Sequence, residues 1–155
     1  MCSAKATPKF KQLKQSYGFD EVAIVPGNVT LNPEQTVTDF QIGEFTFQVP
    51  IIASAMDGVV DVDFAIRMGK LGGLAVLNLD GIQARYKNPG EILEKIAKAS
   101  DSEVTGILQK IYQEPIKENL VAERVQAIKK GGVICAISLV PANTRRLASV
   151  VKEAG

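Results

Sequence analysis

Short apolar runs alternate along the chain with longer segments in which apolar residues recur at helical spacing. The runs cover residues 49–53, 74–80 and 133–140. They are too short for buried helices and rich in branched residues, which is typical of strands buried on both faces of a parallel sheet. Each run is followed by a polar turn and then by a helical segment. The pattern therefore predicts repeated strand–helix units joined by right-handed crossovers.

The helical segments carry recognisable start and stop signals. The helix after the first run is expected to begin near Asp61, whose carboxylate can cap free backbone amides, and to end at Gly72-Gly73. Further helices are predicted within residues 84–130. Asn143 or Thr144 is expected to cap the last helix.

The region before the first run has a different character. Residues 1–16 are rich in lysine and glutamine with weak periodicity, and we expect them to form a flexible arm. Residues 37–49 alternate in polarity around Gly43-Glu44, which predicts a β-hairpin. Residues 17–155 are then expected to belong to one domain, of which they form the N-terminal part.

Small and polar side chains follow the first two apolar runs. Ser54 and Met56 come directly after the first: small residues there let a ligand approach the backbone, and a methionine offers a soft apolar surface to a flat ring. Asp57 and Asp80 are also expected at the carboxyl edge of the sheet, where α/β proteins place their ligands. For both acids a functional and a structural role remain open. No metal is predicted, because no ligand spacing is specific enough.

Composition excludes several classes of protein. The chain has 155 residues, 46% of them hydrophobic, a net charge of +1 and no histidine. Without a basic cluster, nucleic acid is not an expected partner. No apolar run approaches the roughly 18 residues of a membrane helix, and no signal peptide is visible at the N-terminus. We expect a cytoplasmic protein without membrane contact.

The cysteines offer no disulfide framework. Cys2 and Cys135 lie far apart, which suits a reducing compartment. Cys135 lies within an apolar run with no neighbouring cation to activate it, so we interpret it as a core thiol and not as a nucleophile. Cys2 is interpreted as an incidental thiol.

Several of these segments resemble one known family. Residues 19–27 resemble the opening motif of the IMP dehydrogenase/GMP reductase family, and residues 49–57 resemble its first barrel strand. Residues 72–77 are similar to its second strand, and residues 133–142 to the next. The resemblance covers most of residues 17–155.

The resemblance implies an α/β fold, the (β/α)8 TIM barrel, of which this chain would supply the opening segment and about the first three βα units. Such a barrel takes about 250 residues, so we expect the chain to be the N-terminal part of a larger protein. A helical insert at about residues 84–130 would stand where many dehydrogenases carry regulatory CBS modules. The chain is therefore most similar to the IMP dehydrogenase-related branch that lacks these modules.

The resemblance also implies a function in purine and GMP biosynthesis. The expected reaction is NAD-dependent oxidation of IMP to XMP through a cysteine-linked purine, with the catalytic cysteine beyond residue 155. Ser54 and Met56 would bind the substrate. Val25 and Pro26 would border a neighbouring subunit's cofactor site in a homotetramer or octamer. The family also allows for a monovalent cation.

Two alternatives remain. The same fold could serve a GMP reductase, which uses NADPH to deaminate GMP to IMP, or a non-catalytic nucleotide-binding or structural subunit. Residues 1–155 alone are expected to be inactive in every case, since the catalytic loop is not among them.

Overall fold

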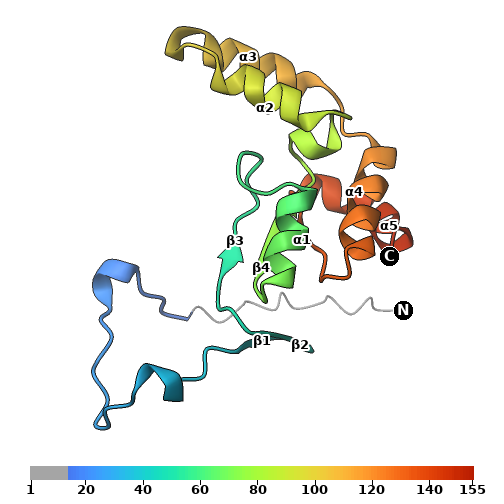
Figure 1. Ribbon diagram of the computed structural model, residues 1–155. Coiled ribbons are helices and arrows are strands. Elements are labelled where there is room, and N and C mark those ends of the chain that lie inside the picture. The colour runs from blue at the N-terminus through green and yellow to red at the C-terminus, as the bar shows by residue number, and fades with distance from the viewer. Residues whose placement is uncertain (1–13) are drawn as a thin grey trace, which may run out of the picture. The chain divides into compact units, whose positions relative to one another are not determined.

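A computed structural model describes residues 14–155 (Figure 1). The chain divides into two compact units, Met1–Thr36 and Val37–Gly155. Cys2 and most of the expected flexible arm at residues 1–16 lie outside the described residues.

The described part of the first unit is irregular. It contains two short 3-10 helices, η1 (Phe19–Glu21) and η2 (Pro33–Gln35). In each of them the side chain of the last residue accepts a hydrogen bond from the backbone just before the helix. The Gly18 amide donates to Glu21 Oε2 at 2.7 Å, and the Asn32 amide donates to Gln35 Oε1 at 3.1 Å. No residue between 14 and 36 is buried, so this segment has no core of its own.

The second unit begins with the predicted hairpin. Strands β1 (Phe40–Ile42) and β2 (Phe45–Phe47) pair antiparallel across Gly43-Glu44. Gly43 has φ of 59°, the left-handed conformation that a glycine adopts at the first position of a tight hairpin turn. The rings of the paired Phe40 and Phe47 stack with centroids 4.9 Å apart.

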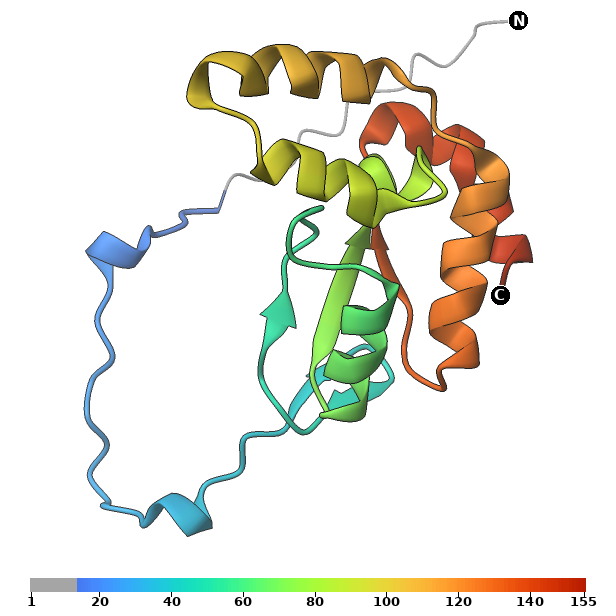
Figure 2. The ribbon, with the colours of Figure 1, turned by 45° about the horizontal axis from the view of Figure 1, so that its top comes forward.

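A parallel sheet follows, in the order β3-β4-β5 (Figure 2). Its strands are β3 (Ile52–Ala53), β4 (Leu74–Asn78) and β5 (Ala136–Ser138). All three lie within the predicted apolar runs but are shorter, since pairing stops where the backbone turns into the loops. The prediction of an α/β fold with a parallel sheet is confirmed.

Three helices pack on the central strand and on one another. Helix α1 (Val62–Lys70) packs against β4 and α4 (Glu118–Lys130), and α4 packs against α5 (Pro141–Glu153). Strands and helices thus follow one another in chain order, which is consistent with part of a (β/α)8 barrel. The core between these helices and the sheet contains Leu77, Leu79, Val121, Val125, Ile128 and Leu147.

The first strand is less buried than its sequence suggests. Ile51 and Ile52 are 56% and 48% exposed, so the prediction of a strand buried on both faces is wrong here. It is also wrong for β5, whose three residues are only half-buried. β3 pairs only with β4, and Ile52 shares its register with Leu74. The neighbouring pair, Ala53 and Ala75, faces the helical core instead.

The segment between β4 and α4 forms a helical hairpin. After the 3-10 turn η3 (Ile82–Ala84), α2 (Pro89–Ala97) and α3 (Asp101–Gln113) pack side by side (Figure 1). No residue of α2 is buried, and Ile111 alone is buried in α3. The predicted insert at 84–130 therefore has two parts: α4 packs with α1 and α5, whereas α2 and α3 pack on each other.

The helix boundaries match the sequence signals in part. Asp61 caps α1 by accepting the Phe64 amide at 2.7 Å, as predicted. Gly72 ends α1 with φ of 91°. The predicted cap at Asn143 or Thr144 is wrong, because α5 already begins at Pro141. Among the described helices, none combines the length and apolar character that crossing a bilayer requires.

Candidate functional site

The loops after β3, β4 and β5 meet at the carboxyl edge of the sheet (Figure 2). Side-chain hydrogen bonds join them: Asn78 at the end of β4 donates to Asp57 after β3 at 3.4 Å, and Asn143 in α5 donates to Asp80 after β4 at 2.5 Å. The predicted gathering of polar residues at this edge is therefore present.

The loop carrying Ser54 and Met56 is tightly folded. The Met56 amide donates to the Ser54 carbonyl at 2.8 Å, and the Met56 carbonyl accepts the amides of Val59 and Val60, each at 2.9 Å. Val60 is fully buried and anchors the end of the loop, whereas Met56 is 57% exposed. Ser54 is exposed as well. Both predicted substrate-binding side chains are thus accessible.

Asp57 joins three segments of the chain. Besides Asn78, its carboxylate accepts the Ile82 amide at 3.0 Å and the Tyr112 hydroxyl at 2.6 Å. The carboxylate lies directly on the backbone at Gly81, where a Cβ atom would come within 1.9 Å of Asp57 Oδ1. A side chain at position 81 would therefore displace the Asp57 carboxylate from its hydrogen bonds.

Asp80 holds the start of the last helix. Its carboxylate accepts the Val140 amide and the Asn143 side-chain amide, and its own amide donates to Asn78 Oδ1 at 3.0 Å. A carboxylate at a helix N-terminus satisfies free amides and complements the helix dipole. Asn143, expected to cap the helix, instead binds this carboxylate.

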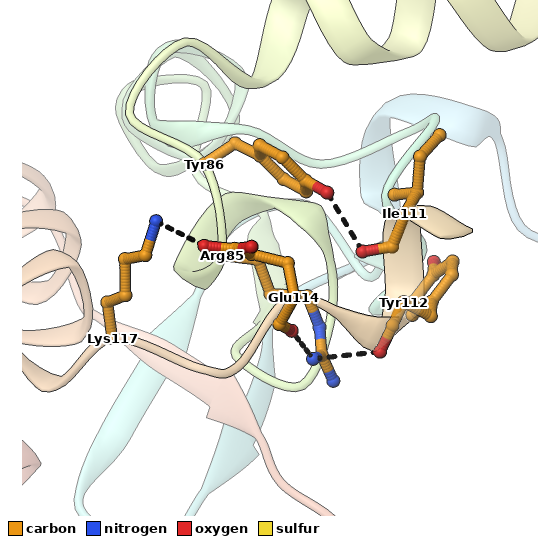
Figure 3. Close-up of polar contacts among 6 residues, drawn as sticks. All are labelled: Arg85, Tyr86, Ile111, Tyr112, Glu114 and Lys117. Atoms are coloured by element: carbon orange, nitrogen blue, oxygen red, sulfur yellow. Dashed lines mark hydrogen bonds and ion pairs between the residues drawn. The ribbon is translucent and has the colours of Figure 1, made fainter. Parts of the chain in front are cut away.

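Arg85 ties the loop after β4 to the end of α3 (Figure 3). Its guanidinium donates to the Asp80 carbonyl at 2.9 and 3.0 Å, and to the carbonyls of Tyr112 (3.2 Å) and Glu114. It also lies over the Tyr112 ring, with Cζ 5.5 Å from the centroid. The planar fork of donors suits such a junction of several carbonyls.

Two tyrosines complete this junction (Figure 3). The Tyr86 hydroxyl donates to the Ile111 carbonyl at 3.0 Å, and the Tyr112 hydroxyl donates to Asp57. Burial, the hydrogen bond to Asp57 and the charge of Asp57 raise the pKa of Tyr112 to about 12. Tyr112 therefore stays protonated and remains a donor at neutral pH.

The remaining predicted residues divide between the two units. Val25 and Pro26 lie in the first unit, in the extended stretch between η1 and η2, and Val25 is 83% exposed. Asp57 and Asp80 lie at the sheet edge, where both carboxylates already accept several hydrogen bonds from the protein.

Sequence reasoning missed Tyr112 and Arg85. Helical periodicity assigns Tyr112 to the apolar stripe of α3, and no local signal marks a hydroxyl that reaches a carboxylate 55 residues away. Arg85 lies five residues after Asp80, and its side chain reaches the Asp80 carbonyl because the 3-10 turn η3 folds the chain back between them.

Cys135 lies away from this edge. It borders a cavity of about 380 Å³ at the start of β5, beside Phe45, Lys129 and Ile137. Burial raises the pKa of the Cys135 thiol, although Lys129 acts in the opposite direction. A protonated thiol is a poor nucleophile, which supports the interpretation that Cys135 is not a nucleophile. Cys135 is only partly buried at the border of the core, so it is less buried than predicted. Within residues 14–155, no group of three or more acidic, cysteine or histidine side chains could hold a metal ion.

A parallel sheet that gathers polar side chains at its carboxyl edge has the arrangement in which α/β proteins commonly place ligand sites. Residues 16–88 match the family model described as IMP dehydrogenase / GMP reductase domain. The resemblance read from the motifs is confirmed over this part of the chain, which is related to the IMP dehydrogenase/GMP reductase family.

Individual proteins extend the similarity to most of the chain. An uncharacterized oxidoreductase of Mycobacterium leprae is 30% identical over 92% of this chain and 39% of its own length. An inosine-5'-monophosphate dehydrogenase of Methanocaldococcus jannaschii is 26% identical over 63% of the chain and 21% of its own length.

A solved structure agrees with these relatives. The crystal structure of an IMP dehydrogenase/GMP reductase-like protein from Corynebacterium glutamicum superposes with a TM-score of 0.82 at 27% identity, over 92% of this chain and 40% of that one. The chain thus spans about two fifths of the proteins that it matches along most of its length.

Proposed function

We propose that this chain is part of a (β/α)8-barrel oxidoreductase that oxidises IMP to XMP with NAD. The observation that carries the proposal is the exposed, folded loop bearing Ser54 and Met56 at the carboxyl edge of the sheet, within the segment that matches the family model. In this proposal the Met56 side chain supports the flat purine ring and Ser54 contacts the nucleotide.

The nucleophile of the proposed reaction is a cysteine outside these residues. Cys135 does not suit this role, because its pKa is raised by burial and it lies at the opposite end of the sheet from Met56. For the nicotinamide cofactor, Val25 and Pro26 offer an apolar edge, and the 83% exposure of Val25 leaves it accessible to a ring system.

A paired assay of the full-length protein tests the reaction. One sample contains IMP and NAD and is followed by NADH formation; the other contains GMP and NADPH and is followed by NADPH loss. We expect NADH and XMP in the first sample and no reaction in the second. NADPH loss with IMP and ammonia would make the protein a GMP reductase. Nucleotide binding without either reaction would favour a non-catalytic subunit.

A substitution tests the loop. Met56→Ala should lower kcat/KM for IMP about tenfold, which corresponds to the loss of about 1.4 kcal/mol of contact energy. Leu71→Ala is the matched control, because Leu71 is also an exposed apolar residue, 72% exposed, but lies at the other end of α1. Equal kinetics for the two variants would contradict a role of Met56 in binding.

A further inference from the structure

Tyr112 connects the α2–α3 hairpin to the loop on which the proposed function depends. Its hydroxyl donates to Asp57 Oδ2 at 2.6 Å, and Asp57 directly follows Met56. We propose that Tyr112 is a positioning residue for the Ser54–Met56 loop, so that the α2–α3 hairpin sets the affinity of the site for its nucleotide. This inference rests on the proposed nucleotide binding by that loop.

The carboxylate of Asp57 has few other supports. Asn78 donates to it at 3.4 Å, a long contact, and the Ile82 amide donates at 3.0 Å. Both of these donors belong to β4 and the turn after it. Among the described residues, the Tyr112 hydroxyl is the closest donor to Asp57 and comes from a different element. Without the Tyr112 hydroxyl, the Asp57 carboxylate keeps only the hydrogen bonds from Asn78 and Ile82 among those described.

Tyr112 is itself held by contacts with Arg85. Arg85 donates to its carbonyl at 3.2 Å and covers its ring, and the same guanidinium binds the Glu114 carbonyl (Figure 3). Glu114 in turn pairs with Lys117 at 2.7 Å, just before α4 begins. A rotation of α3 would therefore move the Tyr112 hydroxyl relative to Asp57. The contact at Tyr112 thus transmits the position of the hairpin to the loop.

The chain supplies a matched control in Tyr86. Its hydroxyl also joins the turn after β4 to α3, by donating to the Ile111 carbonyl at 3.0 Å, but it does not bind Asp57. Tyr112→Phe and Tyr86→Phe each remove one hydroxyl from the same junction. Only Tyr112→Phe removes a hydrogen bond to Asp57, the residue that follows the Ser54–Met56 loop.

Both variants of the full-length protein are compared with wild type in two measurements. The first is the dissociation constant for IMP by calorimetry together with the KM values for IMP and NAD. Tyr112→Phe should weaken IMP binding and raise the KM for IMP about fivefold, a modest loss because Tyr112 is 43% exposed and water can replace part of the bond. The KM for NAD should stay within about twofold, and Tyr86→Phe should change neither value.

The second measurement needs no ligand. Hydrogen exchange at the amides of Val59 and Val60, which bond to the Met56 carbonyl, should accelerate in Tyr112→Phe and stay at the wild-type rate in Tyr86→Phe. Identical exchange and identical IMP affinity in the two variants would overturn the inference while leaving the proposed function intact. A rise of both KM values together with a lower Tm would also overturn it, since that pattern indicates general damage. Wild-type protein that binds no purine nucleotide would overturn both proposals.

Discussion

The two ends of the parallel sheet are built by different means. At the carboxyl end, side chains bind backbone groups of other segments: Asp57 binds the Ile82 amide, Asp80 the Val140 amide and Arg85 the Tyr112 carbonyl. At the amino end, Phe47 of the hairpin stacks on Phe40 and lies beside the turns into β4 and β5. A cavity with mainly apolar walls lies beside β5 at the same end.

The carboxyl end therefore mainly orients the loops, whereas the amino end mainly stabilises the fold. Hydrogen bonds are directional, and each contributes only about 1 kcal/mol net, so the carboxyl end fixes where loops lie more than how firmly the protein folds. Apolar packing has no such direction but contributes more for each residue buried. Substitutions at the amino end should therefore cost more stability than those at the carboxyl end, and those beside Asp57 should also cost ligand binding.

The largest expected effect is at the amino end. Phe47→Ala removes a ring that is 5% exposed and should lower the free energy of unfolding by about 3–4 kcal/mol, because it leaves a cavity and removes the stack with Phe40. Urea unfolding of the full-length protein measures this loss. Phe45→Ala, in the same strand but 51% exposed, should cost much less. Comparable losses in the two variants would refute the role of packing at this end.

The next effect is at the carboxyl end. In Gly81→Ala the new Cβ would come within 1.9 Å of Asp57 Oδ1, so the carboxylate must move away. This should lower the free energy of unfolding by about 2 kcal/mol. IMP binding should weaken as well, because Asp57 adjoins Met56. Thermal unfolding and calorimetry detect both changes. Gly90→Ala is the control: nothing lies within 4 Å of its Cβ in α2, and it should be neutral or stabilising. Unchanged IMP affinity in Gly81→Ala would argue against the importance of Asp57.

A smaller effect is expected at the start of α5. Asp80→Ala removes the acceptor of the Val140 amide and should cost about 1 kcal/mol, as for other lost helix caps. Asp63→Ala, an exposed acid in the first turn of α1, should cost at most about 0.5 kcal/mol. If the two losses measured by urea unfolding are equal, Asp80 contributes through helix-dipole attraction alone.

The smallest effect near neutral pH concerns Tyr112. Its pKa is raised from 10.0 to about 12, so the folded protein binds this proton more tightly than the unfolded chain does. The resulting stability is fully present below about pH 10 and is lost as the pH rises through 12. The difference in tyrosinate absorbance between wild type and Tyr112→Phe should therefore appear near pH 12. A difference that appears already near pH 10 would show that the hydroxyl does not bind Asp57.

The sequence predicts the apolar packing of the amino end better than the polar contacts of the carboxyl end. Apolar periodicity locates the strands, the buried stripe of α4 and the hairpin around Gly43, because burial follows the spacing of residues along an element. It also places Asp57 and Asp80 on one edge, since parallel strands end together.

Partners of the polar side chains could not be predicted in this way. Tyr112 fits an apolar stripe, and only the fold shows that its hydroxyl reaches Asp57. Asn143 fits the pattern of a helix cap, yet its amide binds Asp80 because α5 begins two residues earlier. Such pairs depend on tertiary contacts between segments that are distant in the sequence, and spacing along one element carries no information about them.

The contacts of the Arg85 junction differ greatly in the length of chain that they enclose. Arg85 reaches Asp80 across five residues and Tyr112 across 27, whereas the bond between Tyr112 and Asp57 spans 55. Closing a longer loop costs more chain entropy and is slower. The turn after β4 should therefore form first, the α2–α3 hairpin should then close onto it, and the Met56 loop should be secured last. Slow assembly of the hairpin would accordingly delay the appearance of a binding-competent protein.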